Sequence, residues 1–589
     1  MKTLRYIILG LCLLSGTVAC NGFLDLFPKD EVSSNTVFTS PELAESAVIP
    51  AYSNILYDYV SPDLDRVNWD AFAGVLDPYY DNFYSNYLYL NGNIQPTAGI
   101  FLTYWKRLYE GVNRANDIIE HMPSVPGMDD KIKARRVAEC KFLRAYHYYK
   151  MNALWGGVPW YEKNLAPSEY TRARETEDAI WDKIIADLTD CIDCADLPDK
   201  YAANSADFGR ITKGAAYALR GKVYMWKKQW DKAEADFLAI GPLGYALLNK
   251  PYADVFTLAN ECSDEILFSA RMVELSGYGN AFSRSYGSWQ VAGKGGNNTF
   301  YMNTKFVDSY QNANGSEFKW SDIFPGWDGM SPEARSVYFL RDGLTADEID
   351  AMTTYGADMS QYLPAGNEAR IKAAYASRDP RLAASVITPY ATFKGGFFGT
   401  ATDYTRRFPY RKDQAPENDI RTKQNTHFYY AIRKFVVVGL DCTNETYNPV
   451  DIPIIRYAQV LLDLAEAVNE QGRTGEAVGY VNQVRARAGV AGYNSGPAFL
   501  NVTTKEDLRE RIVRERRWEL AGEEVLYYDE LRQGTWKDFR FADGNGLLEP
   551  WGTAEYRNQW GGNAYLHWPI PSKEAEMNRN LIQNDGWLD

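Results

Sequence analysis

Apolar residues recur at helical spacing through much of the chain and predict helices joined by short turns. From 101 to 121 one apolar face repeats every three or four residues, and the spacing resumes from 130 to 155 after Pro123, Pro126 and Gly127. This spacing puts the apolar side chains on one face of each helix, where a neighbour can bury them. We therefore expect the two segments to form a helical hairpin.

Other segments repeat this arrangement. The same spacing predicts helices over 177–194, 211–228, 455–471 and 476–488. A further helix carries Phe237, with Pro242 beyond it, and the order of small turn, alanine, phenylalanine and proline resembles the second half of a tetratricopeptide repeat. Because the hairpin near Phe237 and the hairpin at 455–488 are far apart in sequence, the pattern does not predict an uninterrupted solenoid.

A final helix is predicted from 505 to 532. It contains a run of mixed charge, Arg509 to Glu519, in which positive and negative residues alternate. Alternating signs are typical of a solvated helix laced with ion pairs, so we expect this run to face water.

The region 251–453 differs in texture, because Gly, Asn, Ser and aromatic residues dominate it and few helical stretches remain, notably 367–377. Long loops inside a compact protein are usually functional. We therefore divide the chain into a signal segment at 1–19, a helical region at 20–250, a loop-rich region at 251–453 and a C-terminal helical region at 454–589, the last three forming one globule.

The first residues resemble a bacterial secretion signal. A short basic stretch precedes an apolar run at 6–14 that is too short to span a bilayer. The sequence Thr17-Val18-Ala19-Cys20 then resembles a lipobox, although Thr17 replaces the usual leucine. We expect Cys20 to be acylated and to begin the mature protein; the alternative is a simple signal peptide in which Cys20 is incidental.

The amino-acid composition limits the kinds of ligand that the protein can bind. The 589 residues carry a formal net charge of −14 and contain 42 Tyr and 16 Trp but only 4 His. An acidic chain with few imidazoles argues against nucleic-acid binding and against multi-His metal sites. Many amphipathic rings instead suit a binding surface that has to stay soluble.

No motif identifies a catalytic centre. The chain has neither an H-E-x-x-H sequence nor a G-x-S-x-G sequence, and its four histidines lack ligand spacing, so we interpret them as packed or surface residues. Cys191 and Cys194 have C-x-x-C spacing, but no second pair completes a zinc site, so we expect buried or half-buried thiols. A pair of carboxylates suited to a glycosidase is not excluded by the sequence.

Two groups of aromatic residues stand in polar surroundings. The first spans 69–89 and contains Trp69, Tyr79 and Tyr80 near Asn82; the second spans 286–327 and contains Trp289, Trp320 and Trp327. A flat ring can take the C–H face of a sugar while amides and carboxylates bind its hydroxyls. We expect most of these rings to be packing residues, with the three tryptophans of the second group as the best candidates for exposed platforms.

Several separated segments carry motifs that occur together in one known family. They are 20–25, 138–146 continuing to 155–159, 454–462 with 481–489, and 514–520 followed by 569–571 and 578–587. In this order and spacing the chain resembles, almost end to end, the SusD/RagB family of outer-membrane lipoproteins.

This resemblance implies a mainly α fold in which tetratricopeptide-like hairpins support long loops and short strands. It also implies a non-enzymatic, lipid-anchored protein on the surface of a Gram-negative cell. Such a protein captures an oligo- or polysaccharide and passes it to a SusC-like, TonB-dependent transporter in the outer membrane.

Within the resemblance the ligand-binding zones correspond to Trp69, Tyr79, Tyr80, Asn82, Trp289, Trp320 and Trp327. No cofactor is expected, and a structural calcium ion is left open because no EF-hand-like run is present. The alternatives are a peptide-binding import protein, a surface glycosidase and a helical-repeat scaffold without a small ligand.

Overall fold

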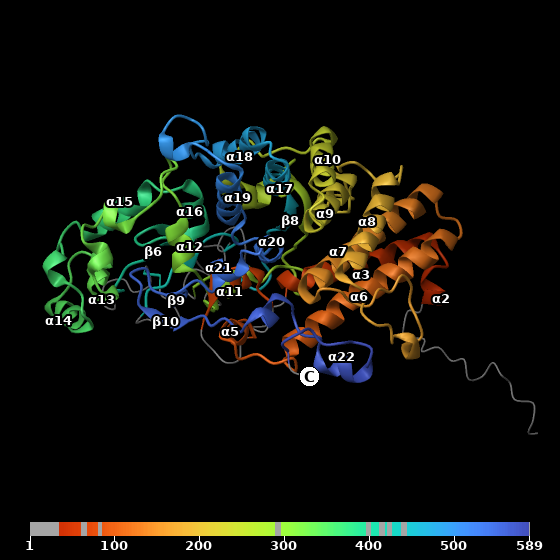
Figure 1. Cartoon of the computed structure of the whole chain (residues 1–589), viewed down its shortest axis with the longest axis horizontal. Coiled ribbons are helices and arrows are strands. Elements are labelled where there is room, and N and C mark those ends of the chain that lie inside the picture. Colours follow the sequence, from red (N-terminus) through yellow and green to blue (C-terminus); the bar gives the residue numbers. More distant parts are fainter. Residues whose placement is uncertain are drawn as a thin grey trace, which may run out of the picture.

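The protein is described from a computed structural model that covers residues 34–60, 67–79, 85–288, 296–395, 402–410, 419–420, 427–436 and 444–587. Long helices gather on one side of the molecule, and short helices and strands make up the other (Figure 1). The long helices of the first half are α3 (Pro41–Val60), α6 (Gly99–His121), α7 (Asp130–Trp155), α8 (Glu177–Asp193), α9 (Lys213–Trp226) and α10 (Trp230–Ile240).

The hairpin of α6 and α7 confirms the prediction from periodicity. The side chain of Asp129 caps α7 by accepting hydrogen bonds from the first backbone amides, and Gly156 ends the helix in the left-handed conformation at φ 65°. The two helices approach closely where Gly111 meets His147, since a Cβ at position 111 would lie 2.2 Å from the imidazole. The absence of a side chain at Gly111 therefore sets how closely this hairpin packs.

The hairpin of α9 and α10 and a later hairpin lie side by side in space, although a long segment separates them in the sequence. Strand β2 (Ile266–Ala270) pairs antiparallel with β8 (Ile452–Arg456), and β8 leads directly into α17 (Tyr457–Glu470) and α18 (Thr474–Ala488). This pairing brings α17 against α10. The helical hairpins therefore form one stack, although the segment between α10 and α17 interrupts them in the sequence. Their separation along the chain gave no sign of this contact.

The predicted final helix is two helices. Helix α19 (Lys505–Leu520) ends before a turn in which Gly522 and Glu524 have φ values of 85° and 60°, and α20 (Leu526–Gln533) follows. A left-handed turn breaks the helical hydrogen-bond pattern and lets α20 change direction.

The expectation that the charged run faces water is wrong for its C-terminal half. Glu515, Arg516 and Glu519 are at most 1% exposed. They are buried because basic and acidic residues from other elements pair with them, a partnership that no local pattern can reveal.

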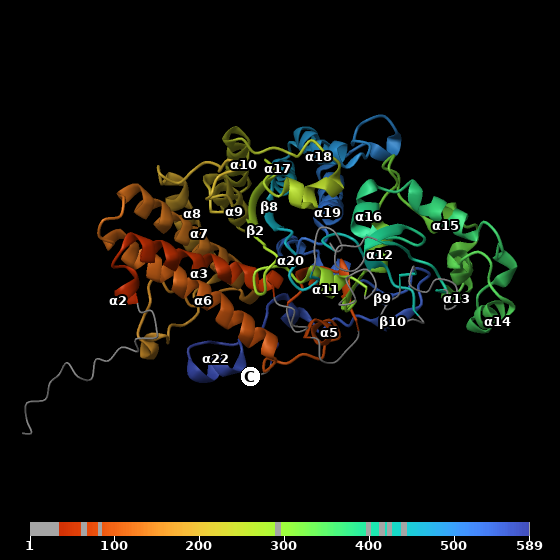
Figure 2. The ribbon, with the colours of Figure 1, turned by 180° about the vertical axis from the view of Figure 1, so that it is seen from behind.

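Short helices dominate the loop-rich region. They are α11 (Phe282–Tyr286), α12 (Thr304–Ser309), α13 (Pro332–Arg335), α14 (Ala346–Tyr355), α15 (Asn367–Ala376) and α16 (Pro380–Ser385). Helix α15 confirms the helix predicted at 367–377. Figure 2 shows α13, α14 and α15 together at the end of the molecule opposite α2 (Ser34–Val37) and α3.

Strands are few and short. The described part of the chain holds five two-stranded antiparallel sheets. Besides β2 with β8, the pairs are β1 (Leu76–Pro78) with β3 (Phe300–Met302), β4 (Val386–Ile387) with β7 (Ala431–Ile432), β5 (Thr392–Gly395) with β6 (Thr402–Thr405), and β9 (Gly546–Leu548) with β10 (Ala554–Arg557). The remaining α-helices are α4 (Trp69–Phe72), α5 (Ser85–Leu90), α21 (Trp536–Arg540) and α22 (Ser572–Met577).

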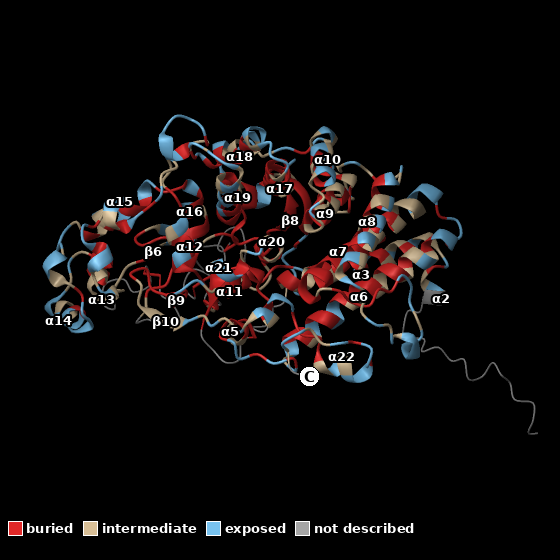
Figure 3. Ribbon diagram, in the orientation of Figure 1, coloured by how far each residue is buried: buried red, intermediate tan, exposed pale blue. Residues whose placement is uncertain are grey.

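A large hydrophobic core runs through the described part of the chain, with members from Phe38 to Leu581. Figure 3 shows the buried residues along its middle and exposed residues on the outer faces of the helices. Cys191 is a buried free thiol and Cys194 a half-buried one, as expected from their helical setting. No helix among the described residues has the length and apolar character needed to cross a membrane.

Candidate functional site

The short sheet of β1 and β3 joins the two aromatic zones that the sequence singled out. Asp77 lies opposite Tyr301 in the antiparallel register, and the backbone N–H of Tyr79 donates to the carbonyl of Thr299. Because successive side chains point to opposite faces, Phe300 enters the main core while Tyr301 points to the other side. Segments more than 200 residues apart therefore form one surface.

A separate aromatic group, which we term the tyrosine cluster, occupies that other side. Its buried members are Tyr79, Tyr301, Tyr429 and Leu547, and Tyr87 and Tyr556 are half-buried against them. The ring centroids of Tyr301 and Tyr429 are 4.9 Å apart, and those of Tyr87 and Tyr556 are 4.9 Å apart at 82°. The edge-to-face contact between Tyr87 and Tyr556 holds these two half-buried rings in place.

Polar groups border the tyrosine cluster. His427 stacks on Tyr429 at 5.5 Å, and its two ring nitrogens lie 3.6 Å from Glu549 and 3.5 Å from Glu555. A hydrogen bond with Glu549 and the charges of both carboxylates raise the pKa of His427, against the effect of its partial burial. The Tyr429 hydroxyl donates to Glu555 at 3.2 Å. Burial, and after it the negative charge of Glu555, raise the pKa of Tyr429.

Buried polar contacts fix the strands beneath these groups. Asp77 accepts hydrogen bonds of 2.8 Å from both Arg540 and Asn303, with all three side chains buried. The hydroxyl of Tyr556 donates to the carbonyl of Pro78 at 2.6 Å, which ties β10 to β1. The site therefore rests on a rigid base, as a pre-formed binding surface requires.

The arrangement combines ring surface with hydrogen-bonding groups. Tyr87, Tyr556 and His427 each keep part of their surface exposed, and the side chain of Glu555 is 20% exposed. Rings can cover an apolar face of a ligand, while the carboxylate accepts and the imidazole donates hydrogen bonds. A ligand with apolar faces and many hydroxyl groups matches this combination.

The structure corrects the prediction for Trp69. Its side chain is 0% exposed, and its ring stacks against Tyr527 at 5.7 Å and Trp568 at 5.6 Å. A ring with its faces covered in this way cannot stack on a ligand. Trp69 belongs to the core because residues from the far C-terminal region cover it.

Trp320 and Trp327 are also packing residues, contrary to the expectation of exposed platforms. They are 7% and 5% exposed and stack on each other at 5.1 Å, with Phe324 stacked on Trp320 at 5.9 Å. Arg335 lies 5.0 Å from the centroid of Trp327. Phe339 packs against Trp320 and Tyr338 against Trp327, so both tryptophans belong to the core of this region.

The other predicted residues divide into two groups. Tyr79 lies in the tyrosine cluster and is 8% exposed, so it supports the neighbouring rings more than it offers a surface of its own. Cys20, Tyr80, Asn82 and Trp289 lie outside the described residues.

Sequence reasoning missed most of the polar border. His427 was interpreted as an ordinary packed or surface histidine, and Tyr556, Glu549 and Glu555 were not singled out. One local signal was available, since Glu555 and Tyr556 lie in a short strand next to Trp551. Their role depends on contacts with segments more than 100 residues away, which spacing alone does not reveal. Among the described residues no group of three His, Cys, Asp or Glu side chains is placed to hold a metal ion.

Comparisons with known proteins match most of the chain. Residues 264–587 match the family described as the SusD family, and residues 23–225 match a family described as "Starch-binding associating with outer membrane". SusD-like protein P25 of Formosa agariphila is 24% identical, with 99% of this chain and 98% of that protein aligned. The starch-binding protein SusD of Bacteroides thetaiotaomicron is 24% identical over 78% of this chain and 74% of that protein.

A solved structure has the same fold. A SusD-like carbohydrate binding protein from Bacteroides fragilis superposes with a TM-score of 0.70 at 23% identity, covering 93% of this chain and all of that one. The mainly α fold with helical hairpins, long loops and short strands is thereby confirmed.

Proposed function

Because this chain belongs to the SusD family, whose pattern spans more than half of it, we propose that it is a glycan-binding lipoprotein of the outer-membrane surface. It captures an oligo- or polysaccharide and delivers it to a TonB-dependent transporter. It carries out no catalysis itself. The single observation that carries the choice of site is the tyrosine cluster, where two distant aromatic zones meet.

The binding mechanism follows from the geometry of the cluster. The half-buried rings of Tyr87 and Tyr556 take the C–H faces of sugar residues, and His427 and Glu555 bind hydroxyl groups at the border. Each contact contributes little free energy after the cost of ordering the ligand, so one sugar residue binds weakly. A polymer that occupies several subsites gains affinity through their number.

Names of relatives support a carbohydrate as ligand. One relative is named for starch and one neighbour for carbohydrate binding. The net charge of −14 disfavours a polyanionic ligand, so a neutral glycan is the class we propose.

Membrane attachment in this proposal depends on Cys20. Acylation there with more than one chain gives a stable anchor. We expect radiolabelled palmitate to be incorporated into the wild-type protein in its host and not into Cys20→Ala, which should be released from the membrane fraction. Equal labelling of both proteins contradicts lipidation at Cys20.

The function is tested by affinity electrophoresis of the mature protein in gels containing neutral and acidic polysaccharides. We expect retardation by at least one neutral polysaccharide, and a marked loss of retardation in Tyr87→Ala. Tyr480→Ala, which removes a half-buried ring from α18, is the matched control and should behave as wild type.

Two outcomes contradict the proposal. Binding of peptides without binding of any polysaccharide excludes the glycan ligand. Release of reducing ends from a bound glycan shows that the protein is an enzyme. Circular dichroism of each variant separates loss of a contact from loss of the fold.

A further inference from the structure

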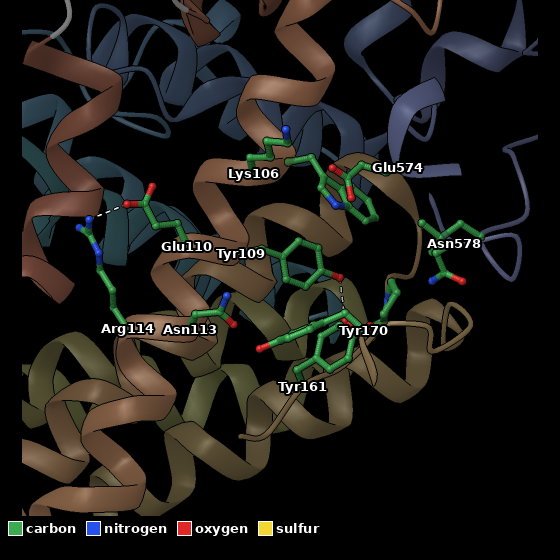
Figure 4. Close-up of a pocket in the computed structure, with 12 residues that line it drawn as sticks. Lys106, Tyr109, Glu110, Asn113, Arg114, Tyr161, Tyr170, Glu574 and Asn578 are labelled. Atoms are coloured by element: carbon green, nitrogen blue, oxygen red, sulfur yellow. Dashed lines mark hydrogen bonds and ion pairs between the residues drawn. The ribbon is translucent and has the colours of Figure 1, made fainter. Parts of the chain in front are cut away.

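A second concave site lies away from the tyrosine cluster. A pocket of about 400 Å³ opens between α6, the segment 159–170 and α22 with the turn that follows it (Figure 4). Its volume falls within the range of about 300–1,000 Å³ that is usual for small-ligand sites. In Figure 1, α22 and α6 lie apart from β9 and β10, which carry part of the tyrosine cluster. No lining residue is shared with the tyrosine cluster.

Aromatic rings form the walls of the pocket. Trp105 and Tyr109 are one turn apart on α6, with centroids separated by 5.1 Å, and Tyr161 packs on Tyr170 at 4.9 Å. The hydroxyl of Tyr109, which is labelled in Figure 4, donates to the carbonyl of Pro159 at 2.8 Å. The rings are therefore held in place before any ligand binds, and their surfaces suit the C–H face of a small ring.

The charges in the lining cancel. Glu110 and Arg114 form an ion pair of 2.5 Å and so satisfy each other. Lys106 and Glu574 add one further charge of each sign. A lining with two positive and two negative groups has no net attraction for a charged ligand, and this favours a neutral one.

Two polar groups of the lining, Lys106 and Glu574, have capacity for new hydrogen bonds. Within the described part of the chain, neither Lys106 nor Glu574 makes a side-chain hydrogen bond or an ion pair within 4.0 Å. Partial burial raises the pKa of Glu574, and the charge of Lys106 opposes this shift across the pocket.

We propose that this pocket binds one or two residues of a neutral sugar and is a second carbohydrate site of the protein. One face of the sugar packs on the half-buried rings of Tyr109 and Tyr170. Its hydroxyl groups donate to Glu574 and accept from Lys106. The inference rests on the proposed function, since it assigns a further site for the same class of ligand.

The test uses calorimetric titration with maltose, cellobiose and laminaribiose, and with glucosamine and glucuronic acid as charged probes. The starting protein carries Tyr87→Ala and Tyr556→Ala, so that binding at the tyrosine cluster is weakened. We expect this protein to bind at least one neutral disaccharide more tightly than either charged probe. Adding Tyr170→Ala should lower that affinity at least about fivefold, the loss expected for one ring contact. Adding Tyr480→Ala instead should leave it unchanged.

Glu574→Gln is a second variant, because it leaves the walls intact while giving the lining a net positive charge. It should weaken binding of the neutral disaccharide and improve binding of glucuronic acid. The inference is overturned if the Tyr87→Ala, Tyr556→Ala protein binds none of the disaccharides while the wild type binds glycans, or if Tyr170→Ala and Glu574→Gln have no effect. It is also overturned if the charged probes bind better than the neutral ones. Absence of glycan binding by the wild type instead contradicts the proposed function itself.

Discussion

At the scale of the residue, Asp70 shows how burial changes a carboxyl group. Its side chain is 0% exposed, and one oxygen accepts a hydrogen bond from the backbone of Glu524 at 3.1 Å. Burial, followed by the negative charge of Glu524, raises the pKa of Asp70 to about 8. Asp70 is therefore protonated in the folded protein across most of the range in which an unfolded chain would ionise it.

This shift predicts a pH dependence of stability. The unfolded carboxyl loses its proton above a pH of about 4, whereas the folded one keeps it until about pH 8. The contribution of Asp70 to the free energy of unfolding is thus fully present below pH 4. It is lost as the pH rises to 8, at up to about 1.4 kcal/mol per pH unit. In Asp70→Asn, the free energy of unfolding measured in urea should fall less steeply between pH 5 and pH 8.

The control for this prediction is Asp347→Asn, which alters an exposed residue of α14. Its stability profile should run parallel to that of the wild type. An Asp70→Asn profile that also runs parallel would show that Asp70 does not titrate as described.

Residue-level roles were the least predictable from sequence. Trp69 stands between Asn68 and Asp70, which suggests a polar loop, yet Tyr527 and Trp568 cover it. The sequence records which residues are aromatic, but exposure depends on partners that arrive from more than 400 positions away. The same reason explains why the sequence did not identify Tyr556 at the tyrosine cluster.

At the scale of the element, α19 is held by a buried network of charges. Arg456 of β8 and Arg381 of α16 donate to Glu519 at 2.7 Å and 3.0 Å, and Arg487 of α18 also pairs with it. Burial alone would raise the pKa of Glu519, but these three guanidinium groups lower it to about 2. One carboxylate therefore connects α19 to three other elements.

Removing this carboxylate should destabilise the fold strongly. In Glu519→Gln the three arginines stay buried with less negative charge to balance them, and a loss of about 3–5 kcal/mol is typical for a broken buried pair. Urea denaturation at pH 7 measures the loss. Because the pKa is lowered, the stability from Glu519 is present above pH 4.5 and is lost as the pH falls towards 2.

Glu510→Gln supplies the comparison on the same helix. Glu510 is 71% exposed and pairs only across one turn with Arg514, so its loss should cost at most about 0.5 kcal/mol. If both variants lose the same stability, the buried network does not hold α19 as described.

Helices were predicted well because their signal is local. The bounds of α7 matched the periodicity at both ends, where Asp129 and Gly156 cap the helix. The break after α19 was missed because a single Gly522 does not by itself end a helix, and the charged residues Glu523 and Glu524 follow it at once. The alternating charges of this helix were interpreted as a sign that it faces water. That interpretation failed because the partners that bury Glu519 come from β8, α16 and α18.

At the scale of the whole molecule, distant segments meet in pairs. β2 with β8 joins the two stacks of hairpins, and β1 with β3 joins the two aromatic zones. The family resemblance gave the overall architecture, because motifs spread along the chain keep their order. It could not give the site, since the position of a ring depends on how the long loops fold onto this frame.

The most direct test of the central claim is the structure of the protein in complex with an oligosaccharide of the polysaccharide that binds it. We predict that sugar residues lie against Tyr87 and Tyr556, with hydroxyl groups within hydrogen-bonding distance of His427 or Glu555. An oligosaccharide bound elsewhere, with the tyrosine cluster empty, would contradict the account.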